Sequence, residues 1–169
     1  MFKHIQRFLK HRWMDRSDSL KAIPADMAER LRQRVASSEQ RHSGEIRICV
    51  EAGLPTSYLW RNASSRERAV MLFGKLRVWD TDHNNGVLIY LLLADRAIEI
   101  VADRGLNQVV SPAQWQQMIK NLRPALQNNQ WEEGLTQALA AISAVFVQQF
   151  PVASDTTNPD ELPDIVILL

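Results

Sequence analysis

The segment between residues 80 and 86 carries the residue types best suited to hold a hard cation. Asp80, Asp82 and Asn84 occur at every second position, the spacing of oxygen ligands in calcium-binding loops. No bidentate glutamate follows at the required place, so the segment is not an EF-hand. Oxygen ligands favour calcium or magnesium over zinc, and a metal-bound water could attack a phosphoryl group.

A second polar group, Asp103 and Arg104, follows the third predicted strand. A hairpin turn at Ala94-Asp95 pairs residues whose numbers sum to about 189, which sets Asn84 or Asn85 opposite this group. Both loops then meet at one edge of a sheet. We therefore predict one acidic pocket that binds Ca²⁺ or Mg²⁺ weakly, with Arg104 available for a phosphate and with five metal ligands: Asp80, Asp82, Asn84, Asn85 and Asp103.

Simpler interpretations of these residues stay open. Asp and Asn are good turn residues because they bond their own backbone, and Arg104 could neutralise the carboxylates without any metal. His83 lies in the same loop. It could serve as a metal ligand or as a proton donor, or it could simply be a solvated side chain. Secondary candidates are Glu45, expected at the same edge, and Asp95 with Arg96 at the opposite one. There the helix that begins after Ser64 could hold an anion among three arginines, Arg61, Arg66 and Arg68.

The rest of the sequence excludes several kinds of site. Cys49 is the single cysteine, which rules out an internal disulfide and a cysteine-based zinc site; we expect it in the core. The chain has no phosphate-binding glycine loop, no Gly-x-Ser-x-Gly elbow and no His-Glu-x-x-His motif, and we expect no organic cofactor. With 20 basic and 19 acidic residues, its net charge of +1 argues against a nucleic-acid partner.

The N-terminal arm, residues 1–22, is the most basic part of the chain. Its first 16 residues include five basic residues and one acidic residue, a net charge of +4. Apolar residues recur there at helical spacing, which predicts an amphipathic helix that packs on the body through Phe2, Ile5, Leu9 or Trp13. Contact with an anionic membrane is the alternative. The chain has no signal peptide and no transmembrane segment of about 20 apolar residues, so we expect a cytoplasmic protein.

Apolar periodicity predicts one α/β domain over residues 23–151 of the 169-residue chain, followed by a C-terminal extension, residues 152–169. Its first two strands are joined by a helical crossover and should be parallel, whereas the third returns antiparallel. Val87–Leu93 is apolar on both faces, as is typical of a central strand covered on both sides. The predicted fold is a three-layer αβα sandwich around a small mixed sheet, with strands at 45–51, 87–93 and about 98–101 and helices at 25–38, 64–78, from 111 and from 131.

Several of these segments, taken in order, resemble the TPM-domain family. They are the strand Glu45–Glu51, Asn85-Gly86-Val87-Leu88, Asp95-Arg96, Gly105-Leu106 and Trp131-Glu-Glu-Gly-Leu135. The family includes thylakoid-lumen phosphatase-like proteins and uncharacterised bacterial proteins. The resemblance implies an α/β sandwich, divalent-cation binding in some members and acid phosphatase activity in some. Many members have Gly-x-Gly after the third strand, where this chain has Ala102-Asp103-Arg104-Gly105.

Two function classes follow from the sequence. The first is a binding or regulatory module with weak divalent-cation binding, which engages a protein partner or a membrane surface. The second is a metal-assisted phosphatase-like hydrolase that uses the predicted acidic pocket. The lack of a nucleophile beside a base favours the binding module, and the family resemblance keeps the hydrolase open.

Overall fold

The computed structural model describes residues 2–152 and 161–169, with side chains from residue 5 onward. The described residues form one sheet of four strands in the order β3-β2-β1-β4. The strands are β1 (Glu45–Glu51), β2 (Gly86–Leu92), β3 (Ala97–Ala102) and β4 (Ile167–Leu168). The helices are α1 (Phe2–Arg12), α2 (Arg16–Ala22), α3 (Ala25–Glu39), α4 (Thr56–Trp60), α5 (Ser65–Lys75), α6 (Arg104–Asn107), α7 (Pro112–Gln127) and α8 (Trp131–Gln149).

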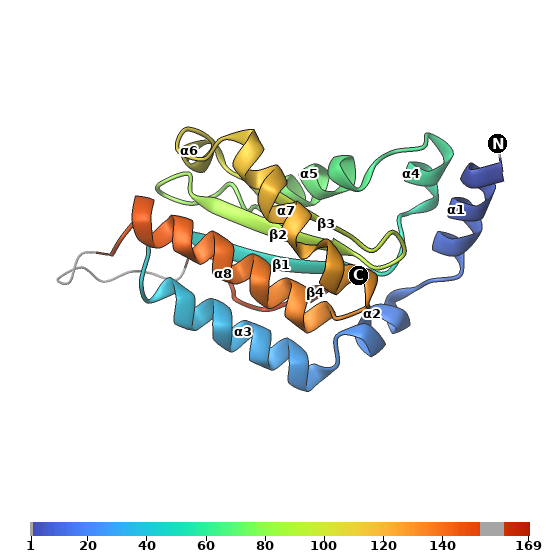
Figure 1. Cartoon of the computed structure of the whole chain (residues 1–169), viewed down its shortest axis with the longest axis horizontal. Helices are drawn as coiled ribbons and strands as arrows, with labels where there is room; N and C mark the ends of the chain where they lie inside the picture. The colour runs from blue at the N-terminus through green and yellow to red at the C-terminus, as the bar shows by residue number, and fades with distance from the viewer. Residues whose placement is uncertain (1, 153–160) are drawn as a thin grey trace.

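Helices cover both faces of the sheet, which confirms the predicted αβα sandwich (Figure 1). Successive side chains of a strand point to opposite faces, so neighbours in β1 enter different cores. Ile48 packs in the core formed with α3, α7 and α8, whereas Cys49 packs in the core formed with α4 and α5. The expectation that Cys49 is a buried core residue is thus confirmed.

The strand β2 lies at the centre of the sheet, and all seven of its residues are buried. It pairs in parallel with β1 and antiparallel with β3. The hairpin register joins Leu92 to Ala97 and Val87 to Ala102, as the turn at Ala94-Asp95 predicts. At the other side of the sheet, β4 pairs in parallel with β1, so the C-terminal residues of the chain cover that edge.

Most helix starts follow their sequence signals. Ser64 and Ser111 both form capping boxes, in which the serine side chain and the third helical residue exchange bonds with each other's backbone N–H. The arm, in contrast, is two helices, because Asp15 forms another capping box that starts α2. Much of the segment that follows α8 lies outside the described residues. No helix in the described part of the chain is long and apolar enough to cross a bilayer.

Candidate functional site

The two predicted polar loops meet where β2 begins and β3 ends. The N–H of Gly105 donates to the carbonyl of Asn84, and the N–H of Asp103 donates to the carbonyl of Gly86, both over 2.9 Å. A Cβ on Gly105 would lie 2.6 Å from the Asn84 carbonyl oxygen, so this approach requires glycine. The hairpin therefore brings Asn84 and Asp103 to the same edge of the sheet.

Most of the predicted ligands at this edge are bonded to protein groups. Asn84 Oδ1 accepts from Arg104 Nε over 2.9 Å, and Asp103 Oδ1 accepts from the backbone N–H of Arg104 over 2.7 Å. Asp80 forms an ion pair with Arg77. Among the described residues, no three His, Cys, Asp or Glu side chains stand together where they could hold one metal ion. Arg104 thus contacts the ligand set rather than an open phosphate position.

Two oxygens of the predicted set nevertheless lack a donor within the described residues. Asn85 is fully buried, and its Nδ2 donates to the Ser43 carbonyl over 2.9 Å, but its Oδ1 has no partner. Asp103 Oδ2 is likewise enclosed without a partner. A calcium ion takes six to eight oxygen ligands, so these two oxygens supply only part of a coordination shell. To complete it, Asn84 would have to release Arg104 and Asp80 would have to release Arg77.

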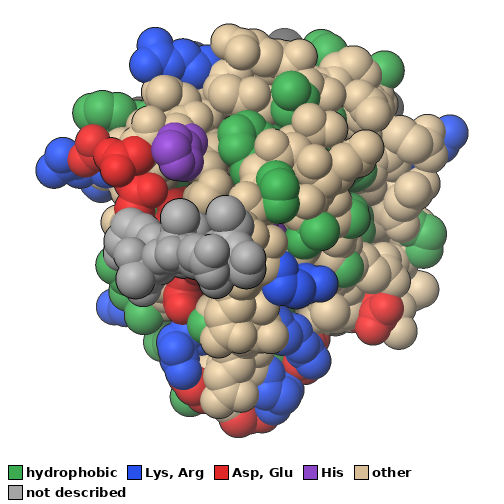
Figure 2. All heavy atoms as spheres, turned by 90° about the vertical axis from the view of Figure 1, so that its left-hand side faces the viewer, with side chains coloured by type: hydrophobic (Ala, Val, Ile, Leu, Met, Phe, Trp, Pro, Cys, Tyr) green, Lys and Arg blue, Asp and Glu red, His purple; other side chains and the backbone are tan. Residues whose placement is uncertain are grey.

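A group of acidic side chains lies on the surface of this end. In Figure 2, Asp and Glu side chains gather beside one histidine. Asp80, Asp82 and His83 are exposed, and the Glu161 carboxylate accepts from the backbone N–H of Asp82 over 2.9 Å. The loop at 80–86 therefore contacts the C-terminal extension at Glu161.

Glu45 reaches the same edge but faces the interior. It pairs with Gly86, and its buried carboxylate accepts from the N–H of Leu162 over 3.1 Å. Beside it, Glu39 accepts from the N–H of Ile46 over 2.9 Å. Burial, and then the Glu45 charge, raise the pKa of Glu39 to about 10, so this carboxyl keeps its proton at neutral pH. Glu39 thus binds the backbone of β1, and Glu45 binds the backbone of the C-terminal extension. The apolar periodicity of the sequence does not reveal this buried pair.

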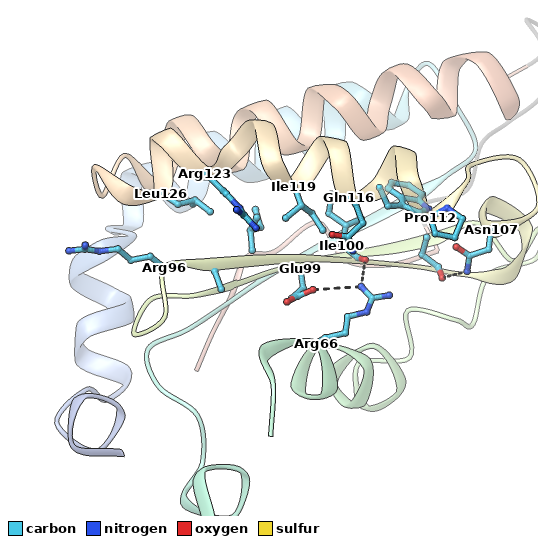
Figure 3. A pocket seen from close by; sticks show the side chains of 14 residues that line it. Arg66, Arg96, Glu99, Ile100, Asn107, Pro112, Gln116, Ile119, Arg123 and Leu126 are labelled. Atoms are coloured by element: carbon cyan, nitrogen blue, oxygen red, sulfur yellow. Dashed lines mark hydrogen bonds and ion pairs between the residues drawn. The ribbon is translucent and has the colours of Figure 1, made fainter. Parts of the chain in front are cut away.

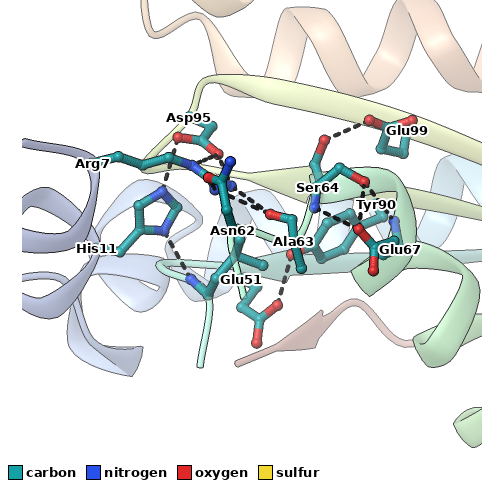
Figure 4. Close-up of polar contacts among 12 residues, drawn as sticks. Arg7, His11, Glu51, Asn62, Ala63, Ser64, Glu67, Tyr90, Asp95 and Glu99 are labelled. Atoms are coloured by element: carbon teal, nitrogen blue, oxygen red, sulfur yellow. Dashed lines mark hydrogen bonds and ion pairs between the residues drawn. The ribbon is translucent and has the colours of Figure 1, made fainter. Parts of the chain in front are cut away.

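At the opposite edge, Asp95 anchors the N-terminal helix (Figure 4). Its carboxylate accepts from Arg7 Nη2 over 3.0 Å and from His11 Nε2 over 2.9 Å. His11 Nδ1 accepts the N–H of Leu54 over 2.9 Å, which leaves the ring proton on Nε2, facing Asp95. Burial alone raises the pKa of Asp95, but the bonds from His11 and Arg7 outweigh it, and the pKa lies below 3.8.

The predicted anion position at the start of α5 is filled by protein groups. Arg61 pairs with Glu67 over 2.7 Å, and Arg68 Nε donates to Glu51 over 2.9 Å. Arg66 donates to a backbone carbonyl of β3. All three arginines expected around an anion are therefore bonded within the protein.

The N-terminal arm is helical and lies on the body, as predicted, but the described residues of its apolar stripe do not form the docked face. Ile5, Leu9 and Trp13 are 51%, 52% and 85% exposed, and the side chain of Phe2 lies outside the described part. The docked face carries Arg7, Phe8 and His11 instead. The Phe8 ring meets Trp60 edge-on, with centroids 5.9 Å apart. The helix binds by this mostly polar face because the partners that receive it, the half-buried Asp95 carboxylate and the Ala63 carbonyl, are hydrogen-bond acceptors.

Comparison with known proteins shows which structures and which family the chain is similar to. Solved structures similar to it include the BA42 protein from the psychrophilic bacterium Bizionia argentinensis, which is 26% identical, with a TM-score of 0.74. That alignment covers 86% of this chain and 94% of BA42. The N-terminal domain of a protein from P. gingivalis shares the fold, with 17% identity, a TM-score of 0.62 and coverage of 76% and 81%.

No match was found among functionally curated proteins. The sequence model of the TPM-domain family matches residues 17–145. This range contains β1, β2 and β3 and the helices that cover the sheet, except for the end of α8. Together with the observed sandwich, this match confirms the resemblance drawn from the sequence. The chain belongs to the TPM-domain family.

Proposed function

We propose that this TPM-domain protein is a binding module that rests on an anionic membrane surface through α1. The observation that supports this proposal most strongly is the stripe of Ile5, Leu9 and Trp13, which the fold leaves exposed. Large apolar side chains aligned on one helix face, within a basic helix, are typical of helices that lie in a membrane interface.

The arrangement of charges around α1 agrees with this proposal. Trp13 follows the last residue of α1 and continues its bonding pattern, because its N–H donates to the Leu9 carbonyl over 3.1 Å. At 100° per residue, Ile5, Leu9 and Trp13 span roughly 80°, on the side opposite Arg7 and His11. Exposed Lys10 and Arg12 flank this stripe on either side. The helix contains no acidic residue. A basic side chain near an anionic leaflet contributes about 1 kcal/mol, so charge and apolar contact add on one face.

Vesicle sedimentation tests the proposal. Wild-type protein should bind vesicles of phosphatidylcholine with phosphatidylglycerol, bind neutral phosphatidylcholine vesicles weakly, and lose binding as salt rises. The double variant Leu9→Ser/Trp13→Ala should bind at least about tenfold more weakly, because it removes two of the three inserted side chains. The matched control is Trp79→Ala, since Trp79 is also half-exposed, at 48%, and lies beyond the far end of α5.

The outcomes separate the proposal from its alternatives. Unchanged binding of the double variant, or equal loss in Trp79→Ala, would contradict the role of α1. Far-UV circular dichroism should show that both variants are folded. Their exposed positions make this the expected result.

A second candidate function is weak cation binding at the acidic edge. It is supported by Asn85 Oδ1 and Asp103 Oδ2, which lack donors among the described residues. Titration with CaCl₂ or MgCl₂ should then shift the amide resonances of Asn84 to Gly86 and of Asp103, with a dissociation constant in the millimolar range. The same titration of Asp103→Asn should give no saturable shift. Equal shifts in both proteins would remove this candidate.

The hydrolytic alternative is a metal-assisted acid phosphatase that uses the same edge. In that function Arg104 would contact the phosphate, so it would have to leave Asn84. Turnover of p-nitrophenyl phosphate with calcium or magnesium, compared between wild type and Asp103→Asn, is the discriminating measurement. The binding-module proposal expects no turnover above background in either protein. Turnover that Asp103→Asn abolishes would favour the hydrolase.

A further inference from the structure

The strand β3 is the outer strand at one side of the sheet. Opposite it, the C-terminal strand β4 covers the edge of β1, but no described strand pairs with the outer side of β3. An uncovered edge exposes backbone N–H and C=O groups that can pair with another chain. The groups that point outward follow from the hairpin register.

The N–H of Asp103 donates to the carbonyl of Gly86, so the backbone groups of every second residue before Asp103 point toward β2. The backbone groups of the residues between them, Ile98, Ile100 and Ala102, point outward. Side chains bond two of these carbonyls: Arg66 Nη1 donates to Ile100, and Asn107 Nδ2 donates to Ala102 over 2.9 Å. The outward N–H groups of Ile98 and Ile100, and the Ile98 carbonyl, have no partner among the described residues.

A groove of about 510 Å³ follows this edge. In Figure 3, Gln116, Ile119 and Arg123 lie on the α7 side of β3, and Arg66 approaches from α5 on the other side. The groove is thus a slot between two helices with the outer edge of β3 along its floor, a form that admits an extended chain. Ile98 and Ile100 are only 3% and 2% exposed, so the chain must enter the slot to reach their backbone groups.

The charge of the groove is positive. Three arginines line it, Arg66, Arg96 and Arg123, against one carboxylate, Glu99. That carboxylate accepts from Ser65 Oγ over 2.6 Å and lies 3.9 Å from Arg66. Arg123 and Arg96 are exposed, and the ion pairs of the described residues include neither. Their charges are available to an acidic ligand.

We propose that the outer edge of β3 binds an extended segment of a partner protein in which apolar and acidic side chains alternate. The backbone of the segment pairs with the outward groups of Ile98 and Ile100 as an added strand. Side chains of a strand alternate between faces, so one set meets Ile119 and Leu126 on the α7 side, and the other set meets Arg66. Arg66 thus contacts the acidic set, and Arg123 and Arg96 at the rim add positive charge that attracts the segment as a whole.

The test uses a synthetic peptide of seven residues in which valine and glutamate alternate. On addition of this peptide, the amide signals of Ile98 and Ile100 should shift, and their hydrogen exchange should slow. Arg123→Glu should weaken binding at least about tenfold, because it replaces attraction by repulsion. Lys120→Glu is the matched control: Lys120 is exposed on the same helix but does not line the groove, and its reversal should change affinity far less.

A second peptide tests strand addition itself. It has the same sequence with N-methyl groups at alternate backbone nitrogens, which keep every charge but remove the N–H donors. It should not bind. Equal binding of the methylated peptide would overturn the proposal in favour of simple anion attraction. Equal binding of a peptide with lysine in place of glutamate would overturn it too, because the arginines would then play no part in recognition. No shift at Ile98 and Ile100 at millimolar peptide would overturn it as well. Vesicle binding through α1 is a separate measurement, so the failure of either proposal is visible alone.

Discussion

Arg7 and Asp95, 88 positions apart in the chain, form the ion pair that fixes the N-terminal helix to the β2–β3 turn. Arg7 Nε and Nη2 both donate to Asp95 Oδ2, over 3.3 and 3.0 Å, and the Arg7 guanidinium also bonds the Ala63 carbonyl. Since His11 uses the other carboxylate oxygen, one side chain determines which face of α1 is docked.

Asp95→Asn should therefore release α1. We expect a loss of about 1–2 kcal/mol in the free energy of unfolding, because partly buried bonds to a charged group are lost. The pKa of Asp95 is lowered in the fold, so its contribution is present above pH 3.8 and disappears as pH falls below that value. Urea unfolding of wild type and variant at pH 7 and pH 3 measures both effects.

The control for this prediction is Asp26→Asn. Asp26 pairs with Arg30 four residues away, but its side chain is 72% exposed. Solvent screens exposed pairs of this kind, so Asp26→Asn should change stability far less than Asp95→Asn. An equal loss in both variants would show that Asp95 is only another surface charge.

Two glycines should respond in opposite directions to alanine. A Cβ on Gly86 would lie 1.8 Å from the Val78 carbonyl oxygen, so Gly86→Ala forces backbone apart and should cost about 2–4 kcal/mol. A Cβ on Gly74 in α5 would meet nothing within 4 Å, so Gly74→Ala should stabilise by about 0.5–1 kcal/mol through helix propensity. Thermal melts of both variants check this pair. If Gly86→Ala leaves stability unchanged, the loop before β2 must move readily enough to make room for the Cβ.

Glu39 should make the protein less stable at alkaline pH. Its pKa is raised from 4.5 to about 10, so the unfolded chain ionises first, and stability falls as pH rises between these values. The slope is at most about 1.4 kcal/mol per pH unit for one proton. Glu39→Gln keeps an acceptor for the Ile46 N–H and removes the titration.

Chemical unfolding from pH 5 to pH 9 measures this effect. The advantage of Glu39→Gln over wild type should grow with pH, whereas Glu133→Gln, on the exposed side of α8, should follow wild type throughout. Parallel curves for wild type and Glu39→Gln would show that Glu39 titrates as an ordinary surface carboxyl.

Leu91, on the central strand, tests the core directly. It is fully buried, and Leu91→Ala should cost about 2–5 kcal/mol because it leaves a cavity. Val70 on α5 is 50% exposed, and Val70→Ala should change stability by less than about 0.5 kcal/mol. Denaturant unfolding compares the two. A loss below about 1 kcal/mol for Leu91→Ala would contradict tight packing around β2.

Local signals in the sequence were sufficient for the first three strands and most helices. The hairpin turn at Ala94-Asp95 determines the register from Val87 to Ala102, because antiparallel pairing needs only the turn position. Ser64 and Ser111 mark helix starts because their caps bond within three residues. Such features depend on near neighbours, which the sequence displays directly.

The docking of α1 and the interior role of Glu45 depend on distant partners. Apolar spacing assigned Ile5, Leu9 and Trp13 to the body, but the position of Asp95 selected the opposite face. Glu45 lies at the predicted edge, but its carboxylate binds Leu162, 117 residues away. Helical periodicity gives the relative directions of side chains and cannot say which direction meets an acceptor.

Because Asp95 and Arg96 are adjacent, the helix proposed to lie on the membrane and the groove proposed to bind a peptide are close together. The helix proposed to lie on a bilayer is held by Asp95, and the groove proposed to take a peptide begins at the next residue. From there β3 extends for six residues, roughly 20 Å at 3.3 Å per residue. A tail that leaves the bilayer beside α1 could enter the groove after a linker of only a few residues, so membrane proteins with short juxtamembrane tails would be captured in preference to soluble ones.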